Sequence, residues 1–129
     1  MTNILNFCRL NNIKVVLIKQ AYYIEPSYQK NLESLSNEEI LDKLLVYHKE
    51  TNRDNKSLFW IYTNLILNNI LNKIKLKNPD VIIVDPTNEL YASGKDKSFY
   101  EDGIHLTAHG NEIIANKIFK SIKKFIIIN

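Results

Sequence analysis

Two short apolar runs, Ile13–Ile18 and Val81–Val84, constrain the fold of this chain more than any other feature. Both runs are rich in β-branched residues, and Lys14 is the only charged residue in either of them. This pattern is typical of a strand in a parallel sheet that helices cover on both faces. Parallel neighbours need a long crossover connection, which is usually helical. We therefore expect an α/β fold in which these two runs are neighbouring parallel strands.

The stretch between the two strands carries the signals of two helices. Ser36 and Glu39 have the spacing of a capping box, and the apolar residues after them predict a helix of about three turns. A second helix is predicted over Ser57–Leu76, and Pro79 prevents it from continuing. One narrow polar stripe runs along this helix, formed by Asn64, Asn68, Asn72 and Lys75. The wide apolar face that remains, which includes Trp60, is expected to pack on the sheet as core.

Three further segments complete the predicted order of elements. Ile4–Leu10 has the pattern of a short helix, Gln20–Leu35 is expected to be a loop, and so is the segment from Asp85 to Phe99. Thr107 can cap a last helix whose apolar positions share one side. Two strands and one layer of helices leave an apolar sheet edge and parts of both faces uncovered. The sequence therefore reads as the C-terminal portion of a larger α/β domain.

Composition excludes several classes of function. The 129 residues have a net charge of +3, with only two arginines, and the lysines are scattered along the sequence, so we expect a solvated basic surface and no nucleic-acid partner. One cysteine, Cys8, cannot form an internal disulfide or a cysteine metal cluster. No metal and no cofactor are predicted. Asparagines interrupt the most apolar stretch, Leu58–Leu71, so we predict no membrane span. The sequence does not open with the pattern of a signal peptide, so we predict a cytoplasmic protein.

The densest group of chemically capable residues lies between Glu101 and Asn111. A serine nucleophile needs an imidazole that takes its proton and a carboxylate that orients the imidazole. Asp102 precedes His105 by three residues, and Gly103 permits the tight turn that would bring the two side chains together. The alternative to a catalytic pair is an aspartate in a loop whose side chain is unrelated to the nearby histidine. His109 is read as a solvated residue of the first helical turn and not as a metal ligand.

The string Asp-Gly-Ile-His-Leu-Thr at 102–107, with Gly110 after it, resembles the last conserved block of the SGNH (GDSL-type) serine ester hydrolases. By this resemblance Asp102 is the orienting carboxylate and His105 the general base of a Ser-His-Asp triad. The two apolar runs then correspond to the last two strands of the family's three-layer α/β/α sandwich with its parallel sheet. Tyr22, Tyr23 and Tyr28, after the first strand, are either lining of an acyl pocket or surface residues of a loop.

The departures from the family are as informative as the match. The family's nucleophile lies in a Gly-Asp-Ser block and its oxyanion hole uses two further blocks, and none of the three occurs in 1–129. We therefore expect a partial SGNH domain, from a shortened reading frame or a degenerate relative, that acts on a small-molecule ester only with a missing N-terminal segment. Self-association through an open sheet edge is the other expected contact. The competing hypothesis is a non-catalytic α/β binding or assembly module in which the dyad is a relic.

Overall fold

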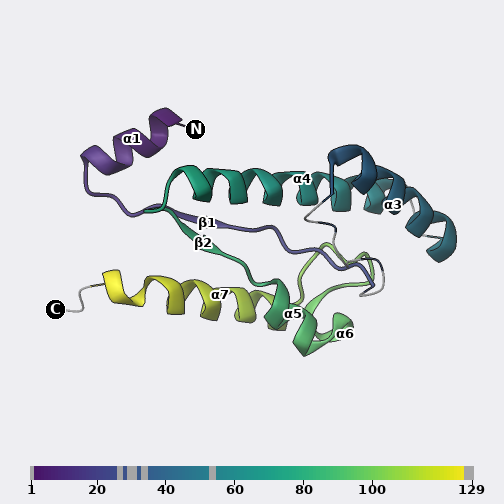
Figure 1. The fold of residues 1–129 in the computed structure, drawn as a ribbon. Coiled ribbons are helices and arrows are strands. Elements are labelled where there is room, and N and C mark those ends of the chain that lie inside the picture. The colour runs from purple at the N-terminus through teal and green to yellow at the C-terminus, as the bar shows by residue number, and fades with distance from the viewer. Residues whose placement is uncertain (1, 26–27, 29–31, 33–34, 53–54, 127–129) are drawn as a thin grey trace.

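A computed structural model describes residues 2–25, 28, 32, 35–52 and 55–126 of the chain (Figure 1). Most of these residues are helical, and a small sheet lies among the helices. The described elements are α1 (Thr2–Leu10), β1 (Val16–Ile18), α3 (Asn37–Thr51), α4 (Asn55–Lys77), β2 (Ile82–Val84), α5 (Thr87–Ser93), α6 (Lys95–Ser98), α7 (Ala108–Ile122) and the 3₁₀ helix η2 (Lys123–Phe125).

The two predicted strands pair in parallel, which confirms the expected α/β character. Val16 lies opposite Ile82, and Ile18 lies opposite Val84. The first strand is shorter than predicted, because the Ile13 N–H donates to the Cys8 carbonyl at 2.8 Å and so closes the end of α1. Figure 1 shows the strand pair between α4 on one side and α7 on the other. Helices therefore lie on both sides of a two-stranded parallel sheet.

The capping box at the start of α3 forms as predicted. The Glu39 N–H donates to Ser36 Oγ at 3.3 Å, and the Ser36 N–H donates to Glu39 Oε2 at 2.8 Å. Helices α3 and α4 then pack with residues that follow β1 to form the larger of two apolar clusters. Its buried members are Tyr22, Ile24, Leu32, Ile40, Leu44, Tyr47, Leu58, Ile61 and Leu65.

The orientation of α4 differs from the prediction. Asn64 and Asn68, which belong to the polar stripe, are only 5% and 4% exposed, so this part of the stripe lies against the interior. Trp60, predicted to be core, is 45% exposed. The cause is the pair of hydrogen bonds that Asn68 makes with the main chain after β1, because a buried amide must keep its partners. No described helix, α4 included, is both long and apolar enough to cross a membrane.

The segment between Asp85 and Phe99, predicted to be a loop, contains the two short helices α5 and α6. Its buried Ser98 donates to the Leu90 carbonyl at 3.0 Å, which ties the two helices together. Behind them lies a second, smaller apolar cluster. The buried members are Ala21, Leu90 and Phe99, and Tyr23, Leu106, Ile113 and Ile114 pack against them. This cluster supports the loop that carries Asp102 and His105.

Candidate active site

The loop between α6 and α7 is closed by main-chain hydrogen bonds. Phe99 and Leu106 form an isolated antiparallel bridge, and the Tyr100 N–H donates to the His105 carbonyl at 2.9 Å. Within the loop, the Gly103 N–H donates to the Tyr100 carbonyl at 2.9 Å. Gly103 is in the left-handed region, with φ at +69°, where residues with a Cβ are strained. The glycine of the motif therefore permits the turn that the sequence predicted.

This turn brings Asp102 and His105 together. Oδ1 of Asp102 accepts from the N–H groups of Ile104 and His105, each at 2.9 Å. Oδ2 lies 2.6 Å from Nδ1 of His105. Burial alone would raise the pKa of Asp102, but the hydrogen bonds from His105 and the two N–H groups outweigh it and lower the pKa to about 2. The carboxylate is thus ionised at neutral pH and held at both of its oxygens.

The ionised carboxylate fixes the state of the histidine ring. A carboxylate only accepts hydrogen bonds, so Nδ1 of neutral His105 carries the proton and Nε2 has a free lone pair. The His105 side chain is 78% exposed, and no group in the described ranges bonds its Nε2. In this form the imidazole can take a proton from a hydroxyl group or a water molecule. It does not pack against the apolar underside of α7.

An open hollow of about 530 Å³ lies beside the dyad. Gln20, which follows β1, contributes to its wall together with Asp102 and His105. The loop is joined to the same end of β1, because the Tyr23 N–H donates to the Gly103 carbonyl at 2.6 Å. The dyad therefore lies near the carboxyl end of a parallel strand, where open α/β sheets bind their ligands. The remaining lining residues are Tyr100, Ile104, Leu106 and Asn111.

The start of α7 is fixed to α6 by two motif residues. Thr107 caps α7 by accepting from the Gly110 N–H at 3.1 Å, and its hydroxyl also donates to the Lys97 carbonyl. Gly110 is buried, and a Cβ at this position would lie 2.2 Å from the Ser98 carbonyl oxygen. Only glycine allows α7 to approach the end of α6 this closely. Thr107 and Gly110 thus position the loop that carries the dyad.

An ion pair that the sequence analysis did not single out lies at the same edge of the sheet. Lys19 directly follows β1 and is 6% exposed, and its ammonium lies 2.8 Å from Oδ2 of Asp85, which directly follows β2. Oδ1 of Asp85 accepts from the Thr87 N–H at 3.1 Å. Burial opposes ionisation of Asp85, but the bonds from Lys19 and Thr87 outweigh it and its pKa is lowered. The sequence contains a signal for this pair, because a charged residue directly follows each apolar run. The carboxyl ends of neighbouring parallel strands lie at the same edge of a sheet, so these two residues are brought together there.

The other residues that the sequence singled out are His109 and the three tyrosines after β1. Nε2 of His109 lies 2.9 Å from the Ser93 hydroxyl, a contact that joins α5 to α7, and Nδ1 lies 3.9 Å from a Glu112 carboxylate oxygen. Tyr22 is core, and Tyr23 stacks on Tyr91 with ring centroids 5.1 Å apart. None of the three predicted tyrosines is among the residues that line the hollow. Across the described ranges no three His, Cys, Asp or Glu residues gather as a metal site.

Comparisons of the chain with protein-family models, with curated proteins and with solved structures found no match.

Proposed function

We propose that this chain supplies the histidine and aspartate of a Ser-His-Asp triad of the SGNH type, and that the triad hydrolyses carboxylic esters. The observation that supports this most strongly is the 2.6 Å contact between Asp102 Oδ2 and His105 Nδ1. It leaves Nε2 exposed beside an open hollow, where a serine hydroxyl and an ester can approach. The finer fold assignment, the C-terminal part of a three-layer α/β/α sandwich, belongs to the same proposal.

In this mechanism Nε2 of His105 takes the proton from the serine hydroxyl as the oxygen attacks the ester carbonyl. The imidazolium that forms is stabilised by Asp102, whose carboxylate stays ionised. His105 then protonates the departing alkoxide, and a water molecule activated by the same nitrogen releases the acyl group. The serine and the oxyanion-hole donors are to come from a segment that carries the family's Gly-Asp-Ser block.

Ser93 is the serine that already contacts a histidine, but its position is unfavourable for a nucleophile. It is the last residue of α5, and the C-terminal end of a helix carries a partial negative charge that opposes an alkoxide. Its partner His109 lies 3.9 Å from the nearest Glu112 oxygen, which is beyond hydrogen-bond distance. We therefore assign the Ser93–His109 contact to the packing of α5 against α7.

The decisive experiment is complementation. The 129-residue chain alone should give no fluorophosphonate labelling and no p-nitrophenyl acetate hydrolysis above that of free imidazole. Adding the Gly-Asp-Ser strand and the two oxyanion blocks of an SGNH esterase, as a fusion or a separate chain, should produce both activities. His105→Ala should then abolish hydrolysis, whereas the control His109→Ala should leave it intact.

Two results would contradict the proposal. Labelling of Ser93 in the isolated chain would place the nucleophile inside the described residues. Complementation that is insensitive to His105→Ala would favour the competing function, a non-catalytic α/β module with a relic dyad.

A further inference from the structure

The basic residues that are scattered along the sequence gather at one end of the molecule. Residues 2–15, 72–81 and 117–126 contain nine lysines and arginines and one acidic residue, Asp80, so their formal net charge is +8. The rest of the chain has eight basic and thirteen acidic residues and a charge of −5. Figure 1 shows α1, the end of α4 and the end of α7 on the side where the strands begin. We call these three segments the basic end.

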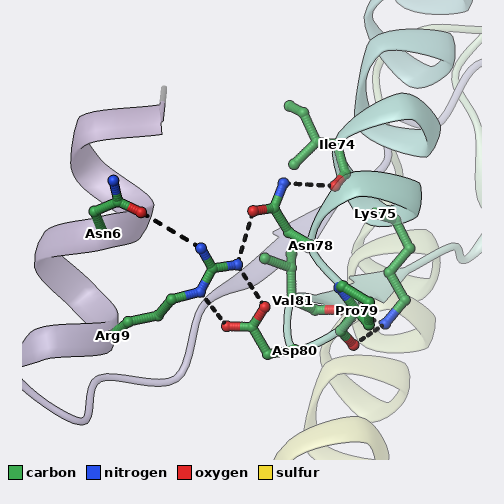
Figure 2. A network of polar contacts seen from close by, with 8 residues as sticks. All are labelled: Asn6, Arg9, Ile74, Lys75, Asn78, Pro79, Asp80 and Val81. Carbon is green, nitrogen blue, oxygen red and sulfur yellow. Dashed lines mark hydrogen bonds and ion pairs between the residues drawn. The ribbon is translucent and has the colours of Figure 1, made fainter.

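Contacts between the three segments hold the basic end together. The Arg9 guanidinium donates to both carboxylate oxygens of Asp80, at 2.8 and 2.6 Å, and to Asn78 Oδ1 at 2.7 Å (Figure 2). These bonds join α1 to the turn after α4. Lys14 Nζ lies 5.5 Å from the centre of the Phe125 ring, which joins the segment before β1 to η2. Lys117 is paired with Glu89, which lies outside the three segments, so one of these positive charges is neutralised there. The remaining positive charge still belongs to one end of the molecule.

The same end exposes large apolar side chains beside its lysines. Leu10 and Leu76 are 84% and 82% exposed, and α1 buries only Leu5 among its described apolar side chains. The other exposed apolar residues of the basic end are Ile4, Phe7, Ile13, Phe119, Phe125 and Ile126. A surface that carries apolar side chains among lysines can insert shallowly among lipid headgroups, while its lysines contact anionic lipids.

We propose that the basic end binds the surface of a bilayer that contains anionic lipids, without crossing it. A nucleic acid is a poorer match, because Arg9 is the only arginine at this end and its guanidinium is committed to Asp80. The exposed leucines also add nothing to a phosphate contact. Binding in this orientation directs the dyad away from the lipid, because the loop between α6 and α7 lies at the other end of the strands (Figure 1). The proposal is independent of ester hydrolysis.

Co-sedimentation with vesicles tests this proposal on the full chain. We expect binding to vesicles of phosphatidylcholine with phosphatidylglycerol, weak binding to phosphatidylcholine alone, and loss of binding as salt rises. Reversing two charges with Lys123→Glu and Lys124→Glu should weaken binding about ten-fold or more. The matched control, Lys43→Glu and Lys49→Glu on α3, should bind like the parent chain. Circular dichroism confirms that each variant is folded.

The apolar contribution is tested with Leu10→Ser and Leu76→Ser, against Leu45→Ser and Val46→Ser on α3 as the control. Only the first pair should weaken vesicle binding. Failure to bind anionic vesicles, or equal effects of the test and control variants, would overturn the proposal. Two further outcomes would also overturn it by identifying another partner. One is tight binding to duplex DNA that the leucine changes leave unaltered, and the other is self-association without vesicles that Lys123→Glu with Lys124→Glu abolishes.

Discussion

The side-chain amide of Asn68 makes two hydrogen bonds with the main chain of Gln20. Its Oδ1 accepts from the Gln20 N–H at 3.0 Å, and its Nδ2 donates to the Gln20 carbonyl at 3.0 Å. The amide thus satisfies both the N–H and the carbonyl of a residue just beyond β1, as a neighbouring strand would do. Asn68 is 4% exposed, so water cannot easily replace these bonds. This contact holds the start of the segment that leads to the candidate site.

Replacing Asn68 with Ala should therefore lower the free energy of unfolding by about 2–3 kcal/mol, because it leaves a buried N–H and a buried carbonyl without partners. Urea denaturation followed by circular dichroism measures the change. Asn72→Ala, one turn further along α4 at a less buried position, is the control and should change stability by less than about 0.5 kcal/mol. Equal costs at the two positions would mean that the bonds to Gln20 contribute little.

Gly110→Ala should destabilise the chain by about 1–3 kcal/mol, the usual cost of overpacking. The new Cβ would lie 2.2 Å from the Ser98 carbonyl oxygen, so the start of α7 must move away from α6. Thermal unfolding measures the loss. Asn111→Ala, at the next position, is exposed and should have little effect on stability. A neutral Gly110→Ala variant would show that this glycine does not position the loop.

The parts of the structure that the sequence predicted are those that depend on local pattern. Both strands, the capping box at Ser36 and the cap at Thr107 follow from residue type and spacing alone. The close pairing of Asp102 with His105 was predictable for the same reason, since the turn involves only neighbouring residues. The helices α5 and α6 were missed because they are short, and the contact of Ser98 with Leu90 supports them.

The features that were missed depend on residues far apart in the chain. The polar stripe of α4 does not predict the buried position of Asn68, because the partner of its amide, the Gln20 main chain, is 48 residues away. The gathering of lysines at the basic end also needs the fold, since it combines the two ends of the chain with the end of α4. Tertiary contacts that override local polarity are not visible in a periodic pattern.

Acid should release α1 from the turn after α4. The hydrogen bonds from Arg9 lower the pKa of Asp80 from 3.8 to about 2. A lowered pKa in the folded state means that the stabilisation is present above about pH 4 and is lost as the pH falls toward 2. The protection factors of the α1 amides, which are corrected for the pH dependence of exchange in an unfolded chain, should therefore fall over this range. In the Asp80→Asn variant they should be low already at neutral pH, whereas Asp42→Asn on α3 should leave them unchanged.

The last prediction concerns the ring of His105. Asp102→Asn keeps an oxygen that can accept from the Ile104 and His105 N–H groups, so the loop should keep its shape. The new NH₂ group then faces Nδ1 and donates to it, which moves the proton of the neutral ring to Nε2. Nitrogen-15 chemical shifts of the imidazole should report this change of tautomer in the isolated chain, measured with the ring in its neutral form. In a complemented enzyme the same change should lower kcat by about 10⁴-fold, because Nε2 has lost the lone pair that takes the proton. An unchanged tautomer in the variant would show that Asp102 does not control the ring and would remove the main support for a catalytic dyad.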